Sequence, residues 1–256
     1  LPKGDNGASA QDDFISGGIL DCAVGTIAYT NVFGYDASKF PNAKPTTVAD
    51  FFDLQKFPGK RGLKKEAKVN LEMALMADGV ATADVYKVLA TKEGVDRAFK
   101  KLDTIKSSVV WWEAGAQPPQ LLDSGEVIMT TAYHGRLFTP MVKQNKPWVI
   151  VWDGQQQVFD MWVVPKGSKN KDLALDFIAY STSTKALADQ SKYIPYGPLR
   201  KSSIPLVGKF EDGKTDMAPY LPTSPQNMKN AIVQDVKFWT DHLDELSERF
   251  TSWIAK

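Results

Sequence analysis

Cysteine, histidine, excess charge and long apolar runs are all scarce in this chain of 256 residues. The one cysteine, Cys22, can form no internal disulfide and no cysteine-based metal cluster, and we expect it to be a small buried apolar residue. The two histidines, His134 and His242, lack the spacing of a metal-binding motif. The formal net charge is only +1, which removes the main argument for a nucleic-acid partner or an anionic membrane surface. No apolar run approaches the roughly 18 residues of a membrane-spanning helix.

Sequence motifs of the common catalytic and cofactor sites are absent as well. Neither the G-x-x-x-x-G-K-[ST] loop nor the G-x-G-x-x-G loop occurs, which disfavours nucleotide hydrolysis and dinucleotide redox chemistry. No G-x-S-x-G elbow surrounds a serine, so covalent hydrolase chemistry has no support. We predict no cofactor and no metal site.

Hydrophobic spacing alternates between the helical and the strand period along most of the chain. Strand-like runs are predicted at 22–35, 108–112, 127–132, 148–152 and 158–164, and helices at 69–78, 82–90 and 92–106. This alternation predicts an α/β fold with a mostly parallel sheet. The last segment carries apolar residues at steps of four and three from Trp239 to Trp253, an amphipathic helix that must dock on a core.

A group of basic residues precedes the first predicted helix of the middle region. Because Glu66 interrupts it and the chain is nearly neutral, we interpret the group as a solvated face. Its members are Lys60, Arg61, Lys64, Lys65 and Lys68.

Aromatic and acidic residues at the predicted strands are the sharpest functional signal. In open α/β sheets ligands bind outside the carboxyl ends of the strands, where these aromatics can line a cleft, although core packing explains any single one equally well. The acids Glu113, Asp153 and Asp160 interrupt such runs, and an unpaired buried aspartate is costly unless it faces a donor or a cation. A carboxylate between aromatic faces predicts an ammonium ligand, and Asp160 is the strongest candidate. The aromatics are Tyr29, Trp111, Trp112, Tyr133, Trp152, Phe159 and Trp162.

The order of several segments resembles the extracellular solute-binding proteins of bacterial ABC importers, of the spermidine/putrescine-binding type. The most telling pieces are residues 114–127 (Ala-Gly-Ala-Gln-Pro-Pro-Gln-Leu-Leu-Asp-Ser-Gly-Glu-Val), 131–136 (Thr-Ala-Tyr-His-Gly-Arg) and 159–165 (Phe-Asp-Met-Trp-Val-Val-Pro). This resemblance implies the two-lobe α/β fold of type II periplasmic binding proteins, with a ligand between the lobes. It places Asp160 where the family has an aspartate for the ligand amine, and Tyr133 where it has an aromatic platform.

The resemblance also implies a division of the chain into lobes. Residues 1–27 and 159–205 would form a remnant of lobe one, and residues 28–158 and 206–256 would form lobe two. Nothing corresponds to the family's first βα units, so we expect lobe one to be incomplete. We further expect a truncated or proteolysed chain that binds its solute weakly or not at all.

The predicted function is that of a periplasmic, non-enzymatic receptor for a small cationic solute, a polyamine or a related amine, which it passes to an ABC permease in the inner membrane. The stretch 64–69 has only Glu66 among lysines where polyamine binders have further carboxylates, which disfavours a long diamine anchored at both ends. Arg136 indicates an amino-acid-like or opine-like ligand if it points inward, and is a surface residue otherwise. The predicted ligand-binding residues are Asp160, Tyr133, Glu113, Trp162, Tyr29, Gln117 and Arg136.

Two other classes of function stay open. A glycoside-type hydrolase would use Glu113 and Asp160 as paired carboxylates among aromatics that stack on sugars. An adaptor would bind a partner through the amphipathic C-terminal helix and leave that helix undocked in the monomer.

Overall fold

The computed structural model describes residues 1–256 and divides into two compact units. Unit 1 comprises Leu1–Thr30 and Gln157–Lys229, and unit 2 comprises Asn31–Gln156 and Asn230–Lys256. The chain passes between the units within strand β2 (Ala23–Asp36), within strand β6 (Trp148–Trp162) and near residue 230.

The third passage differs from the expected one near 205. Residues 206–229 belong to unit 1 because their backbone bonds to other parts of that unit. Gln157 Nε2 donates to the carbonyl of Pro222 at 2.8 Å, and the N–H of Glu211 donates to the carbonyl of Lys192 at 2.8 Å. Because this segment is rich in proline, its sequence predicts a loop. The sequence of a loop does not indicate which of the two units the loop contacts.

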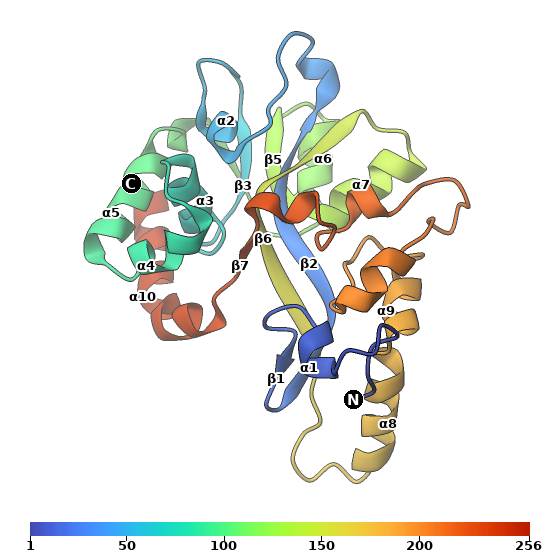
Figure 1. The fold of residues 1–256 in the computed structure, drawn as a ribbon. Coiled ribbons are helices and arrows are strands. Elements are labelled where there is room, and N and C mark those ends of the chain that lie inside the picture. Colours follow the sequence, from blue (N-terminus) through green and yellow to red (C-terminus); the bar gives the residue numbers. More distant parts are fainter. The chain divides into compact units, whose positions relative to one another are not determined.

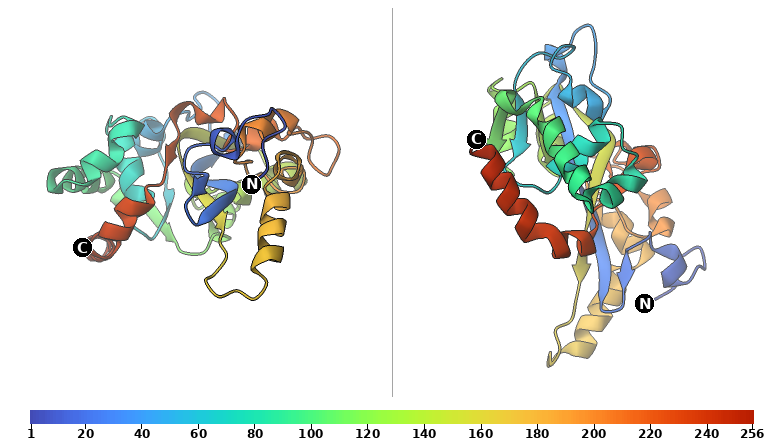
Figure 2. Two further views of the ribbon diagram at one scale, coloured as in Figure 1. Left: turned by 60° about the horizontal axis from the view of Figure 1, so that its bottom comes forward. Right: turned by 90° about the vertical axis from the view of Figure 1, so that its left-hand side faces the viewer.

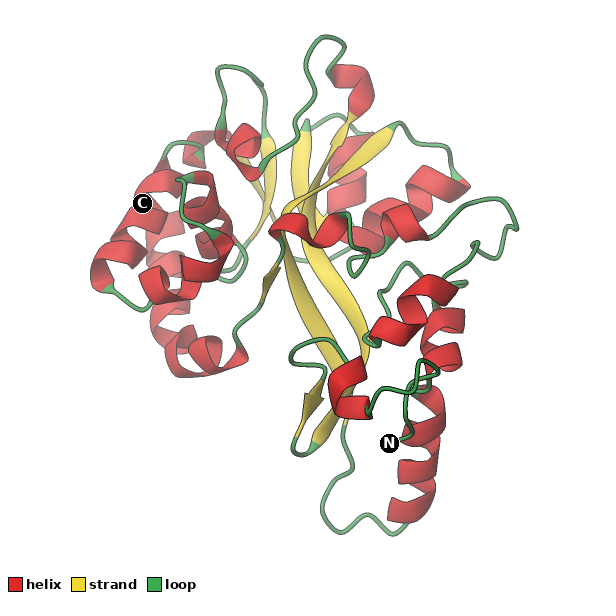
Figure 3. Ribbon diagram, in the orientation of Figure 1, coloured by secondary structure: helices red, strands yellow, loops and turns green.

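A single mixed sheet runs in the order β4-β3-β5-β2-β6-β7, with β1 (Ile19–Leu20) paired to β2. Strand β3 (Arg61–Lys64) pairs in parallel with both β4 (Val109–Trp112) and β5 (Met129–Tyr133), whereas β2 and β5 are antiparallel. The sheet is therefore less parallel than the alternation of elements predicted. The two runs predicted around residues 148–164 form one continuous strand, β6 (Figure 3).

Unit 2 contains most of the helices, which cover its part of the sheet (Figure 1). Its remaining elements are η1 (Ala37–Lys39), α2 (Val48–Phe52), α3 (Asn70–Ala77), η2 (Thr82–Asp84), α4 (Val85–Leu89), α5 (Lys92–Asp103), η3 (Lys106–Ser108), α6 (Gln117–Asp123), α7 (His134–Lys143), β7 (Ile232–Val233) and α10 (Val236–Ile254). Thr47 and Asp50 form a reciprocal capping box at the start of α2. Gly79 follows α3 with a φ of 87°, a conformation that ends a helix.

The C-terminal helix α10 is uninterrupted (Figure 2) and buries its predicted apolar stripe in the core of unit 2. Trp239, Leu246 and Phe250 are at most 3% exposed and belong to the same hydrophobic cluster as α3 and α5. The helix is thus docked, contrary to the adaptor hypothesis. All helices of the structure are too short or too polar to cross a membrane.

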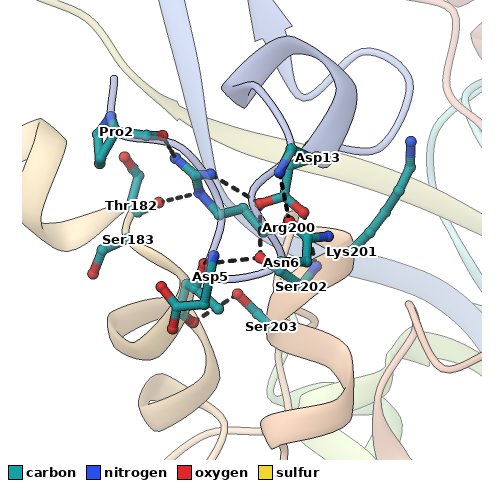
Figure 4. Close-up of polar contacts among 12 residues, drawn as sticks. Pro2, Asp5, Asn6, Asp13, Thr182, Ser183, Arg200, Lys201, Ser202 and Ser203 are labelled. Atoms are coloured by element: carbon teal, nitrogen blue, oxygen red, sulfur yellow. Dashed lines mark hydrogen bonds and ion pairs between the residues drawn. The ribbon is translucent and has the colours of Figure 1, made fainter.

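Unit 1 is organised around a buried arginine. Its further elements are α1 (Ala10–Asp13), α8 (Lys171–Ser181), α9 (Thr184–Gln190), η4 (Lys201–Leu206), η5 (Ala218–Tyr220) and η6 (Asn227–Asn230). Arg200 is fully buried and donates to Asp13 Oδ2 at 2.9 Å, to the carbonyl of Thr182 at 2.6 Å and to that of Pro2 at 3.0 Å (Figure 4). Burial opposes ionisation of Asp13, but hydrogen bonds from Ser202 and Arg200 outweigh it and lower the pKa of that carboxyl. This pair fastens the N-terminal segment to the rest of unit 1.

The burial predictions for Cys22 and for the basic group were wrong. Cys22 is exposed, because it lies in the turn between β1 and β2 rather than inside the strand. The basic group is not a uniform solvated face, since Arg61 is fully buried and donates to the carbonyls of Phe51 and Phe57 at 2.7 and 2.6 Å. A guanidinium that can reach several backbone carbonyls is tolerated in a core where an isolated charge is not.

Candidate functional site

Three parallel strands of unit 2 end at the same edge of the sheet. Their last residues are Lys64 of β3, Trp112 of β4 and Tyr133 of β5, and Lys64 is in register with Trp112. The carboxyl edge of parallel strands is where open α/β sheets bind ligands. We call Lys64, Glu66, Trp112 and Tyr133 the strand-end cluster.

The ammonium of Lys64 lies at the centre of this cluster. Its Nζ is 2.9 Å from the Tyr133 hydroxyl and 2.8 Å from Glu66 Oε1. It also lies 5.4 Å from the Tyr133 ring centroid and 6.0 Å from that of Trp112, whose rings meet edge to face with centroids 6.1 Å apart. Burial alone would lower the pKa of Lys64, but the contacts with Glu66 and Tyr133 outweigh it and raise the pKa, so the residue is charged at neutral pH.

The loop after β3 is held by a buried asparagine. Asn70 Nδ2 donates to the carbonyls of Lys64 and Glu66, both at 2.7 Å. Val69 then starts α3 in the left-handed region, at φ 70°, and its carbonyl accepts from Gln156 Nε2 at 2.8 Å. A β-branched residue is strained in this region, so these buried amide contacts fix the backbone that carries Glu66.

The loop after β4 lies against the ring of Tyr133. A side chain at Gly115 would place its Cβ 3.1 Å from that ring and 3.7 Å from Arg136 Nε, a contact so tight that the ring would have to shift by a few tenths of an ångström. Gln117 Oε1 accepts from the backbone N–H groups of Glu113 and Ala114 at 2.8 and 2.7 Å. The side-chain oxygen of Gln117, a predicted ligand-binding residue, therefore positions this loop.

The predicted site residues fall into both units. Glu113, Gln117, Tyr133 and Arg136 lie in unit 2, at or beside the strand-end cluster, and Tyr29, Asp160 and Trp162 lie in unit 1. Glu113 is exposed and pairs with Lys65 at 3.1 Å, and Arg136 is exposed in the first turn of α7.

Asp160 is exposed near the end of β6 rather than buried as the sequence suggested, and its side chain forms no hydrogen bond or ion pair. It shares one face of the strand with Trp162, whose ring packs edge-on against Phe177 with centroids 5.4 Å apart. Tyr29 is half-buried on β2. The desolvation argument for Asp160 fails because the outer end of β6 is only partly covered.

Sequence reasoning missed Lys64, Glu66 and Asn70 as site residues. The four residues of β3 include an arginine, a glycine and a lysine, so their pattern did not predict a strand and Lys64 could not be recognised as a strand end. The available signal was the asparagine just before the α3 helical pattern, a residue that bonds readily to nearby backbone.

Comparison with known proteins agrees with this architecture. The two-unit α/β fold is that of periplasmic binding proteins. Residues 5–223 match the family described as bacterial extracellular solute-binding protein, and the chain belongs to that family. The chain is thus a solute-binding component of an ABC importer, and the relatives described below are named as binding proteins or receptors.

The similar proteins are named for several solutes. A gamma-aminobutyric acid (GABA)-binding protein of Pseudomonas aeruginosa is 45% identical over 243 residues, which are 95% of this chain and 67% of that protein. A solved GABA receptor is 36% identical with a TM-score of 0.79, over 100% of this chain and 76% of that one. The binding protein MotA of A. tumefaciens, in complex with glucopine, is 27% identical with a TM-score of 0.80, over 99% and 77%.

The spermidine/putrescine type is a distant neighbour. A spermidine/putrescine-binding protein of Streptococcus pneumoniae is 17% identical with a TM-score of 0.69, over 91% of this chain and 69% of that one. At this identity the likeness concerns the fold alone. The predicted family is therefore confirmed at the level of solute-binding proteins, and the polyamine subtype is not supported.

Proposed function

We propose that this chain receives a small solute that carries both an ammonium and a carboxylate group, such as GABA, in the periplasm and delivers it to an ABC permease. It acts by binding and carries out no chemical step. The mixed charge of the strand-end cluster is the observation that carries this proposal. Cationic and acidic groups alternate there around two aromatic rings, as a zwitterionic solute requires.

The ion pairs around the cluster disfavour a polyamine. Glu66 is already neutralised by Lys64 at 2.8 Å, and Glu113 by Lys65 at 3.1 Å. A polyamine would have to displace two resident ammonium groups to reach these carboxylates. The 45% identity to a GABA-binding protein supports the smaller, zwitterionic solute.

Asp160 keeps its proposed role as the partner of the ligand ammonium. Its carboxylate is exposed and unpaired in unit 1, so it is available to a cation. Residues 1–30 and 157–229 would then represent lobe one and the remainder lobe two. Replacing one member of a charge pair that binding buries costs at least about 2 kcal/mol.

Binding experiments with four solutes test the proposal. Saturation-transfer NMR and calorimetry would compare GABA, putrescine, spermidine and an opine, because NMR also detects weak binding. We expect GABA to bind in preference to both polyamines, and Asp160→Ala to weaken GABA binding at least about 30-fold. Tighter binding of a polyamine would overturn the zwitterion assignment, and unchanged affinity in Asp160→Ala would remove Asp160 from the site.

A further inference from the structure

We infer that Lys64 determines ligand specificity by occupying, with its own ammonium, the aromatic slot that an ammonium ligand would otherwise take. The slot then recognises a carboxylate of the solute. This inference rests on the proposed function. It adds which end of the solute binds at the strand-end cluster of unit 2, namely the carboxylate.

The surroundings of Lys64 Nζ are those of a cation-binding site. Two aromatic rings, a hydroxyl oxygen and a carboxylate surround it, with the polar contacts at 2.8 and 2.9 Å. Aromatic faces and a carboxylate are the groups by which proteins bind organic ammonium ions. The protein thus supplies the cation for this slot from within.

The backbone conformation holds the Lys64 side chain in the slot. Lys64 is the last residue of β3, and Asn70 holds its carbonyl and that of Glu66 at 2.7 Å each. The Lys64 side chain is only 21% exposed, and it is far less mobile than a surface lysine because three groups of the cluster contact it. A ligand ammonium would have to expel it and leave two like charges close together.

Hydrogen-bond donors are in excess around the slot. An ammonium has three N–H donors, and Lys64 uses two of them, for Glu66 and for Tyr133. The indole N–H of Trp112 is buried without an acceptor, and Arg136 Nε lies 3.7 Å from the Cβ position of Gly115 beside the Tyr133 ring. The one carboxylate of the cluster, that of Glu66, is already paired with Lys64, so the remaining donors have no anionic partner and a carboxylate of the solute would supply one.

A substitution that keeps the stem and removes the charge tests the inference. Lys64→Met would be compared with Lys60→Met, a matched control at an exposed lysine that immediately precedes the same strand. The probes are GABA, butyrate and n-butylamine. We expect Lys64→Met to lose at least about tenfold in affinity for GABA and butyrate and to gain n-butylamine binding, with Lys60→Met unchanged. An unaltered preference among the three probes in Lys64→Met would overturn the inference.

Lysine acetylation followed by mass spectrometry gives a readout that needs no ligand. Lys64 should react at least about tenfold more slowly than Lys60, because its ammonium is hydrogen-bonded and partly buried. Equal rates would show that the slot is not self-occupied. The two proposals can fail separately. If Lys64 is acetylated slowly and Lys64→Met gains n-butylamine binding, but the wild type does not bind GABA, then the proposed solute is wrong and the self-occupied slot is retained.

Discussion

At the scale of single residues, the most unusual group outside the site is the buried carboxyl of Glu72 on α3. Trp239 Nε1 donates to its Oε1 at 2.7 Å and the Tyr86 hydroxyl donates to the same atom at 3.1 Å. Glu72 is fully buried without a basic partner, and burial raises its pKa to about 7 despite these hydrogen bonds. The contact joins α3 to α10 within unit 2, so its protonation affects the stability of that unit.

The sign of the pH dependence follows from this raised pKa. The stabilising contribution of Glu72 is fully present below the unfolded pKa of about 4.3, and it is lost as the pH rises to about 7. We expect a loss of up to about 3 kcal/mol in the free energy of unfolding, measured by urea denaturation between pH 4.5 and 8. Glu72→Gln keeps an acceptor for Trp239 but cannot ionise, so its curve should be flatter. Exposed Glu126→Gln is the control, and equal slopes for Glu72→Gln and wild type would contradict the prediction.

At the scale of elements, the N-cap residue Asp235 stabilises the start of α10. Asp235 is its N-cap, and its Oδ1 accepts from the backbone N–H of Phe238 at 2.9 Å. Asp235→Ala should lower the free energy of unfolding by about 1 kcal/mol, whereas Asp235→Asn should keep nearly all of it. Urea denaturation followed by tryptophan fluorescence measures this, since Trp239 and Trp253 lie on the helix. Equal stability of the alanine and asparagine variants would show that the cap is not used.

The elements also show what the sequence could predict. The amphipathic stripe of α10 is a local pattern, and it was predicted correctly. Strand β3 was missed because its stability comes from pairing with β4 and β5 on its two edges, and both strands lie far along the chain from it. Lys64 is the last residue of this strand. Because the strand was missed, Lys64 was interpreted as a solvated lysine, whereas its hydrogen-bond partner Tyr133 was predicted as a ligand-binding residue.

At the scale of the whole molecule, the two units have separate cores. The hydrophobic clusters of unit 2 contain no residue of unit 1, and the cluster around Phe14 and Leu199 lies entirely in unit 1. Two of the three passages between the units lie within the long strands β2 and β6. The third passage has no strand pattern and was placed too early.

Each unit also contains one fully buried arginine, and this pair offers a matched test of the separate cores. Arg200→Met leaves Asp13 as an uncompensated buried charge and should cost unit 1 about 3–5 kcal/mol. Arg61→Met leaves the carbonyls of Phe51 and Phe57 without their donors and should cost unit 2 at least about 3 kcal/mol.

Hydrogen exchange read by mass spectrometry distinguishes the two effects by location. Arg200→Met should accelerate exchange in peptides from 1–30 and 157–229, and Arg61→Met in peptides from 31–156 and 230–256. The expectation rests on cores that share no side chain, so that opening one does not expose the apolar surface of the other. Equal acceleration in both sets of peptides by either variant would instead identify one cooperative folding unit, in which the strands shared by the two units transmit the loss of one arginine to the whole chain.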